Sequence, residues 1–423
     1  MTVGGQLARR LGTADAVTIG LGSMIGAGIF SAFAPAAAAA GSGLLIGLAL
    51  AAGVAYCNAV ASAQLAARYP SSGGTYVYGR ERLGEWWGFL AGWGFVIGKT
   101  ASCAAMALTF AAYAVPGSGW TQRLVALAAV AALTAANYRG ISRTARLARL
   151  LVTGSLLALA VVVAAIATGG EAGAGNLGGL SALGSGGAYG ILQSAGLLFF
   201  AFAGYARIAT LGEEVRDPAR TIPRAIPLAL AIVVCIYLVV GFAALGAAGP
   251  DAIAASRAPL DAAVRAAGAA WAQPVVRAGA VLASLGSLLA LIAGVGRTSL
   301  AMARNGDLPR WLDSVHPRYS VPDRAELAVG AVIGVLVLTT DLRGAIGFSS
   351  FGVLVYYAIA NASAYTQPAE ERRWPRALNA VGFVACLVLV ATLPPAAAVA
   401  GLSMFAVGVV GRSLSRRRLL HAL

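Results

Sequence analysis

Long apolar stretches dominate this sequence of 423 residues. A helix needs about 20 consecutive apolar residues to cross the hydrocarbon core of a bilayer. Hydrophobic residues make up 59% of the chain and charged residues only 11%, whereas a soluble domain carries roughly 25% charged residues. We therefore expect an all-α membrane protein with twelve transmembrane helices. The predicted spans are residues 14–38, 43–67, 86–114, 122–138, 146–168, 188–212, 223–247, 275–303, 325–340, 345–364, 377–394 and 396–412.

The positive charge of the chain, +15 at neutral pH, is distributed over the short segments between these stretches. Of the 31 cationic residues, 30 are arginine and one is Lys99. When both termini are placed in the cytoplasm, 23 arginines fall on the cytoplasmic side and five outside, and the other two lie in spans or at their ends. This asymmetry follows the positive-inside rule. The charge thus predicts a multi-pass protein of the cytoplasmic membrane, and no nucleic-acid partner.

The predicted spans contain few residues that could bind a metal ion or catalyse hydrolysis. The four cysteines lie far apart inside apolar runs, and the two histidines, His316 and His421, fall in polar segments. The spans contain no metal-ligand spacing and no nucleophile–base pair. We therefore expect no metal, no cofactor and no enzymatic activity. The external segment 250–271 is predicted to form either a helical lid or an ordinary surface loop.

Glycines interrupt the first predicted span. Four of them fall within residues 20–28, and each weakens a helix interior by about 1 kcal/mol. Unwound backbone at membrane depth is tolerated only where it is buried in protein or lines a cavity. The N–H groups that begin the second half-helix would attract a carboxylate. Close packing of small residues is the alternative explanation.

The sixth span has a weaker counterpart at residues 199–207, where Gly204 follows an aromatic cluster. Core packing explains this segment as well as a break does, but its position is informative. Interrupted helices at the first and sixth spans are expected from two inverted five-helix repeats with a site between them. Carbonyls of the sixth span would accept hydrogen bonds from an ammonium while the first span holds a carboxylate, which predicts a zwitterionic ligand.

Four segments together resemble the amino acid–polyamine–organocation (APC) superfamily of secondary transporters over nearly the whole chain. They are residues 22–30, residues 69–78 with the Gly88-Phe89 and Gly92-Trp93 pairs, residues 212–226, and residues 302–309. The resemblance implies the LeuT-type five-plus-five inverted repeat with discontinuous helices 1 and 6, two additional helices, and alternating access. The implied division is a cytoplasmic N-terminus (1–13), repeat 1 (14–168), repeat 2 (188–364), helices 11 and 12 (376–412) and a basic cytoplasmic tail (413–423).

The resemblance also implies positions for the substrate site. By position, Leu291 replaces a tryptophan that covers the guanidinium in the arginine–agmatine exchanger of this family, so an arginine-type cargo is not expected. Ala206 stands where many members have an acid. The implied substrate-binding residues are Ser23, Met24, Ile25, Gly26, Ala27 and Gly28 for the carboxylate, Phe202, Ala203, Gly204 and Tyr205 for the amine, and Phe200 and Leu291 beside the cargo.

Lys99 lies about 13 residues into the third span, or roughly 20 Å at 1.5 Å per residue. At that depth an ionisable group is a functional candidate by default. Three interpretations remain open. Lys99 is a structural lysine bonded to carbonyls at a helix break, a tethered cation or proton carrier in coupling, or a substrate contact with Cys103 one turn further on.

Other polar residues have competing interpretations. Glu213 and Glu214 follow the sixth span and are expected to form an ion-pair cluster at an inner gate, with a proton site as the alternative. Ser155, Ser284 and Ser287 either bond to helix backbone or form a sodium-like oxygen site with first-span carbonyls. Ser155 stands where relatives among the cationic amino acid transporters carry a lysine. Tyr356 and Tyr357 are interpreted as packing aromatics.

The sequence therefore predicts a secondary transporter for a neutral amino acid in the lipid bilayer, with a proton or sodium ion as an open choice of coupling partner. A carrier or exchanger of polyamines, other amines or acidic amino acids is the alternative within the same class. A receptor that binds amino acids without transporting them is the alternative from another class.

Overall fold

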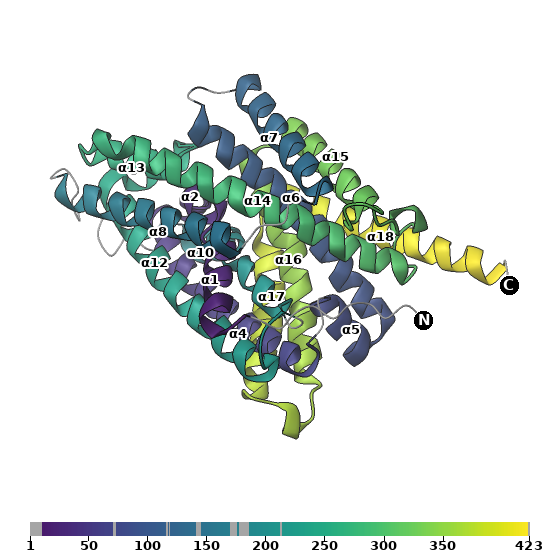
Figure 1. Cartoon of the computed structure of the whole chain (residues 1–423). Coiled ribbons are helices and arrows are strands. Elements are labelled where there is room, and N and C mark those ends of the chain that lie inside the picture. Colours follow the sequence, from purple (N-terminus) through teal and green to yellow (C-terminus); the bar gives the residue numbers. More distant parts are fainter. Residues whose placement is uncertain are drawn as a thin grey trace.

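The computed structural model describes residues 11–70, 73–115, 117, 119–140, 145–169, 176, 186–211 and 214–421. Figure 1 shows that this part of the chain is a bundle of helices. Its one strand-like pairing is an isolated bridge between Leu11 and Val215. The α-helices are α1 (Thr13–Met24), α2 (Ala27–Ser31), α3 (Phe33–Ala40), α4 (Leu44–Arg68), α5 (Thr75–Leu83), α6 (Glu85–Ala114), α7 (Trp120–Tyr138), α8 (Ala145–Thr168), α10 (Gly187–Phe202), α11 (Ala206–Ala209), α12 (Pro218–Ala255), α13 (Pro259–Ala266), α14 (Gln273–Arg304), α15 (Asp323–Thr339), α16 (Leu342–Tyr365), α17 (Arg376–Thr392) and α18 (Pro395–His421).

Each of the twelve predicted spans coincides with one helix or with a set of helices separated by a short break. In the described part of the chain, nine helical segments are long and apolar enough to cross a membrane. The helix α17 is apolar but shorter, and α7 and α15 are not among the nine. These findings support a multi-pass membrane protein, while the count of twelve spans stays a prediction.

Two helices run further than the sequence pattern indicates. The helix α12 begins at Pro218 and continues to Ala255 across a kink at Gly249, where φ is 73°. Proline suits the first turn of a helix because its missing N–H would have no partner there. The helix α18 continues past the predicted end of its span at residue 412 to His421.

Glycines bring α6 and α16 together near the centre of the bundle (Figure 1). A Cβ at Gly98 would lie 3.1 Å from the Ser349 carbonyl oxygen, and one at Gly352 would lie 2.9 Å from the Gly98 Cα. Small residues at such a crossing allow the backbones to approach closely. This packing fixes the part of α6 that carries Lys99.

A buried ion-pair network connects α5 and α18 to the segment after α14. The carboxylate of Asp307 accepts from the Tyr76 hydroxyl at 2.8 Å and pairs with Arg80 at 2.9 Å and Arg412 at 2.7 Å. The Arg412 guanidinium also covers the ring of Trp86 at 4.5 Å. Burial, and then the hydrogen bond to Asp307, raise the pKa of Tyr76, which keeps its hydroxyl protonated as a donor.

Candidate functional site

The first predicted span is interrupted where its glycines indicate. The helix α1 ends at Met24 and α2 begins at Ala27, with Ile25 (φ −78°, ψ 52°) and Gly26 (φ −94°, ψ −142°) in non-helical conformations between them. Gly28 is needed for space, since a Cβ there would lie 2.6 Å from the Cα of Ala201 in α10. The break predicted in the first span is confirmed.

The sixth span is interrupted as well, by the short 3₁₀ helix η3 (Ala203–Tyr205) between α10 and α11. Gly204 in η3 lies against the first break. A Cβ at this glycine would lie 2.5 Å from the Met24 nitrogen and closer still to the carbonyl of Ser23. The two interrupted segments, 180 residues apart in the sequence, are therefore in direct backbone contact.

A tyrosine of α12 connects the same two segments. The hydroxyl of Tyr237 donates to the Met24 carbonyl at 2.6 Å and lies 3.1 Å from the carbonyl oxygen of Ala201. Buried backbone carbonyls that helix breaks release need such partners. Tyr237 thus supplies one hydrogen-bonding group to both breaks.

Lys99 of α6 reaches the second break. Its ammonium donates to the Ala203 carbonyl at 3.1 Å, and the Tyr357 hydroxyl donates to the same oxygen at 3.4 Å. Lys99 is only 7% exposed, and among the described residues its ammonium has no carboxylate in ion-pair contact. This geometry agrees with the structural interpretation of Lys99, and its coupling and substrate roles stay predictions.

The predicted substrate residues are brought together, and all but the half-buried Ser23, Gly204 and Leu291 are buried. Ala27 and Cys103 belong to one buried cluster against which Leu291 packs. The aromatic residues Phe200 and Phe202 belong to the neighbouring cluster. Because Ala27, Cys103 and Phe202 are fully buried, a ligand reaches them only after the helices around the breaks move.

The three serines predicted for an ion site differ in their hydrogen bonds. The Ser287 hydroxyl donates to the Gly22 carbonyl of α1 at 3.4 Å. The Ser155 hydroxyl donates to Leu151 in its own helix at 2.8 Å, as backbone bonding predicts. The Ser284 hydroxyl is buried and has no hydrogen-bond partner among the described residues. A sodium-like site at these serines stays a prediction.

Contacts on the predicted cytoplasmic side hold the segment before α1. The Leu11 N–H donates to the Glu214 carbonyl at 3.1 Å, and the Arg216 N–H donates to Leu11 at 2.9 Å. The Glu214 side chain lies 3.8 Å from Arg207. The ion pair of Glu214 fits the predicted inner gate, and Glu213 lies outside the described residues.

On the opposite side the predicted external segment is helical rather than a loop. The helix α13 fully buries Leu260, Ala263 and Val264. The Tyr113 hydroxyl donates to the Phe30 carbonyl of α2 at 2.7 Å and accepts from the Leu260 N–H at 3.2 Å. One hydroxyl therefore joins α13 to the helix that follows the first break.

Comparison with known proteins decides the family. A sequence model of the amino acid permease family matches residues 11–412, which is nearly the whole chain. The chain belongs to the amino acid permease family, within the APC superfamily.

Relatives of this permease differ in what their names specify. An uncharacterized transporter of Mycobacterium tuberculosis is 61% identical over 412 residues, covering 97% of this chain and 92% of its own. The branched-chain amino acid permease BcaP of Bacillus subtilis is 27% identical over 379 residues, covering 84% and 80%. The chloroplastic cationic amino acid transporter 7 of Arabidopsis thaliana is 28% identical over 404 residues, covering 88% and 68%.

The sequence analysis of this permease missed two tyrosines and described two others incompletely. Tyr237 bonds to backbone at the first break, and Tyr113 bonds to backbone of the helix that follows it. Tyr356 and Tyr357 pack in the core as predicted; in addition, Tyr357 bonds to Ala203, and the Tyr356 hydroxyl accepts from the Thr75 N–H at 3.1 Å. The available signal was a phenol inside an otherwise apolar stretch, because a buried hydroxyl needs a hydrogen-bond partner.

Proposed function

We propose that this permease is a secondary transporter that moves a neutral amino acid across the cytoplasmic membrane. It does so by alternating access between two inverted five-helix repeats in a twelve-span LeuT-type fold with both termini in the cytoplasm. One observation carries the proposal. Two interrupted helices touch at Gly204, and the buried Lys99 ammonium is bonded to the adjacent Ala203 carbonyl at 3.1 Å.

The two breaks supply complementary groups for a zwitterion. The N–H groups at Gly26, Ala27 and Gly28 open the half-helix after the first break, where the helix dipole is positive. Carbonyls of η3 accept hydrogen bonds, as the bond from Lys99 to Ala203 illustrates. A carboxylate therefore belongs at the first break and an ammonium at the second.

The charge of Lys99 selects the cargo side chain. Two like charges about 6 Å apart repel by about 3 kcal/mol at an effective dielectric constant of 20, which corresponds to about a hundredfold in affinity. A cationic side chain beside Lys99 is disfavoured accordingly. Phe200 and Leu291 offer apolar contacts to a neutral side chain instead.

The names of the relatives specify both kinds of cargo, neutral and cationic amino acids. The Bacillus subtilis relative is named for branched-chain amino acids and the Arabidopsis thaliana relative for cationic ones. Among the described residues no carboxylate pairs with the Lys99 ammonium, which favours the first class of cargo for this permease. It also supports an acidic amino acid as a second candidate, because a carboxylate side chain would neutralise that ammonium.

Counterflow in proteoliposomes tests the proposal. Purified protein is reconstituted with internal leucine, and uptake of labelled leucine, glutamate or arginine is followed. We expect leucine to exchange and arginine to be excluded. Preference for arginine would contradict the cargo assignment. Ligand-induced thermal stabilisation without counterflow would indicate a receptor and contradict transport.

Lys99→Met tests the residue itself. The variant keeps the length of the side chain and removes its charge, so the exclusion of arginine should weaken by about a hundredfold. Thr100→Val is the matched control, because Thr100 is buried in the same helix and bonds to the Val96 carbonyl of that helix. If both variants discriminate as the wild type does, Lys99 has no part in selecting the cargo.

A further inference from the structure

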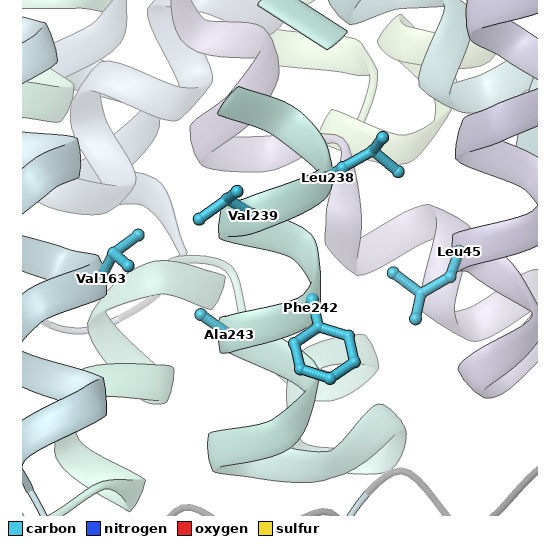
Figure 2. A pocket seen from close by; sticks show the side chains of 6 residues that line it. All are labelled: Leu45, Val163, Leu238, Val239, Phe242 and Ala243. Atoms are coloured by element: carbon cyan, nitrogen blue, oxygen red, sulfur yellow. The ribbon is translucent and has the colours of Figure 1, made fainter. Parts of the chain in front are cut away.

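Side-chain amides gather inside the helix bundle, away from the apolar groove on its outer surface. That groove, of about 470 Å³, is lined by six apolar residues of α4, α8 and α12 (Figure 2). Inside the bundle, by contrast, α4, α16 and α17 carry buried amides, which are costly at membrane depth unless they are hydrogen-bonded. Four of these amide side chains are at most 1% exposed: Asn58, Gln64, Asn361 and Asn379.

Two of the amides meet where α4, α16 and α17 come together. The Asn361 Nδ2 group donates to the Asn58 Oδ1 atom at 2.6 Å and to the Tyr357 carbonyl, one turn earlier in α16, at 2.9 Å. The Cys386 thiol of α17 donates to the same Asn58 oxygen at 3.4 Å. Gly382 of α17 leaves space for Asn361, since a Cβ at this glycine would lie 2.5 Å from the Asn361 Oδ1 atom. The Asn58–Asn361 pair therefore connects the turn of α16 that carries Tyr357 to two other helices.

Tyr357 extends this set of contacts to the second break. Its hydroxyl donates to the Ala203 carbonyl at 3.4 Å, and the same oxygen accepts from Lys99 at 3.1 Å. The Tyr357 ring lies 5.0 Å from the ring of Tyr205 in η3. Because Asn361 holds the main chain of the residue whose side chain reaches Ala203, a continuous set of contacts runs from α17 through α4 and α16 to the break.

The bond between the Tyr357 hydroxyl and Ala203 has a small margin of distance. An O–H···O bond typically measures about 2.7–2.8 Å, and a contact near 3.6 Å is no longer a hydrogen bond. At 3.4 Å the bond is already long. A shift of the Tyr357 turn by a few tenths of an ångström would therefore release the carbonyl.

A second amide pair joins α4 to α17 without reaching the break. The Gln64 Nε2 group donates to the Asn379 Oδ1 atom at 3.5 Å, and the Gln64 Oε1 atom accepts from the Arg373 N–H at 3.4 Å. Within the described part of the chain, neither amide bonds to α16 or η3. The Gln64–Asn379 pair thus matches the first pair in burial and in joining α4 to α17, but it has no contact with Tyr357.

We propose that the Asn58–Asn361 pair sets the affinity of the second break for cargo by holding the Tyr357 hydroxyl on the Ala203 carbonyl. The inference rests on the proposed function, in which carbonyls of η3 accept from the cargo ammonium. Asn58 and Asn361 are positioning residues, because they act on that carbonyl only through Tyr357.

Occupancy of the Ala203 carbonyl determines the direction of the effect. This oxygen has two lone pairs, and Lys99 and Tyr357 donate to it. A cargo ammonium competes with these donors, so its apparent affinity falls with the fraction of protein whose acceptor is free. Loss of the Tyr357 donor leaves one lone pair to the ammonium while Lys99 stays bonded. The dissociation constant of the cargo should then decrease by about two- to fivefold, the lower range for one net hydrogen bond.

Equilibrium binding of labelled leucine to the purified full-length protein tests this inference. Tyr357→Phe removes the donor directly, and Asn361→Ala removes the amide that positions it. Each variant should lower the dissociation constant by about two- to fivefold. The double variant should lower it no further, because both changes remove the same donor. Loss of packing alone would raise the dissociation constant, so the direction of the change separates positioning from general damage.

Two further variants complete the comparison. Asn379→Ala breaks the Gln64–Asn379 pair and should leave the dissociation constant at its wild-type value. Asn58→Ala breaks the Asn58–Asn361 pair from the side of α4 and should act as Asn361→Ala does, so the pair is tested even where Asn361→Ala does not fold. The unfolding midpoint in detergent is recorded for every variant.

Three results would overturn the inference: an unchanged or raised dissociation constant in Tyr357→Phe or in the variants of the Asn58–Asn361 pair, additive effects in the double variant, or the same decrease in Asn379→Ala. Absence of leucine binding by the wild type would overturn the proposed function, and this inference with it. Wild-type leucine binding that the variants leave unchanged would overturn the inference alone, so the two failures are distinguishable.

Discussion

Substitution of Gly204 by alanine tests whether direct contact between the two interrupted helices is essential. The added Cβ would lie 2.5 Å from the Met24 nitrogen, and ordinary contacts begin at 3.4 Å. The obstructing atoms are backbone atoms of residues 23 and 24, which cannot rotate away as a side chain can. The breaks must therefore separate by about 1 Å, and overpacking of this kind costs about 1–3 kcal/mol.

A matched glycine removes the effect of alanine on helix formation. Gly53 lies in the interior of α4, and a Cβ there would meet no atom within 4 Å. Alanine is favoured over glycine in a helix by up to about 1 kcal/mol, so Gly53→Ala should unfold at the same temperature as the wild type or slightly above it. The difference between Gly204→Ala and Gly53→Ala therefore measures only the contact of residue 204 with the first break.

Two measurements then decide the question. We expect Gly204→Ala to lower the unfolding midpoint in detergent and to reduce leucine counterflow by a factor between about 5 and 150, which is 1–3 kcal/mol expressed as an equilibrium ratio. If Gly204→Ala and Gly53→Ala unfold and transport alike, the breaks do not depend on this contact, and the reasoning is refuted.

Two further substitutions test the buried polar contacts through the unfolding midpoint in detergent. Tyr237→Phe leaves a buried carbonyl without its donor and should cost about 1–2 kcal/mol, whereas Tyr56→Phe, at a ring that is 42% exposed, should cost nothing measurable. Equal midpoints for these two variants would contradict the role of Tyr237. Asp307→Asn removes the buried carboxylate that pairs with the buried Arg412 and the half-buried Arg80 and should cost about 3–5 kcal/mol, against less than about 1 kcal/mol for Asp313→Asn, whose ion pair is exposed. A loss at Asp307 no larger than at Asp313 would show that the network does not stabilise the fold.

The sequence predicts the positions of the helices and their breaks because these depend on local composition. Apolar stretches mark the helices, and Gly26 and Gly204 mark places where the helix weakens. The partners of Tyr237 and Tyr113 could not be predicted in the same way. Tyr237 bonds to a carbonyl 213 residues away, and this pairing depends on how α12 packs against α1 rather than on any spacing in the chain.

The Ala203 carbonyl shows how one contact can both close the site and select its cargo. A carbonyl oxygen has two lone pairs, and here Lys99 and Tyr357 already donate to it. On the proposed function, a cargo ammonium that approaches this oxygen has to displace one of the two donors. Displacement of Lys99 frees its ammonium next to the bound cargo, where a cargo carboxylate attracts it and a cationic side chain repels it. The lysine that holds the break in the closed structure is then the group that a neutral or acidic amino acid can release and a cationic one cannot.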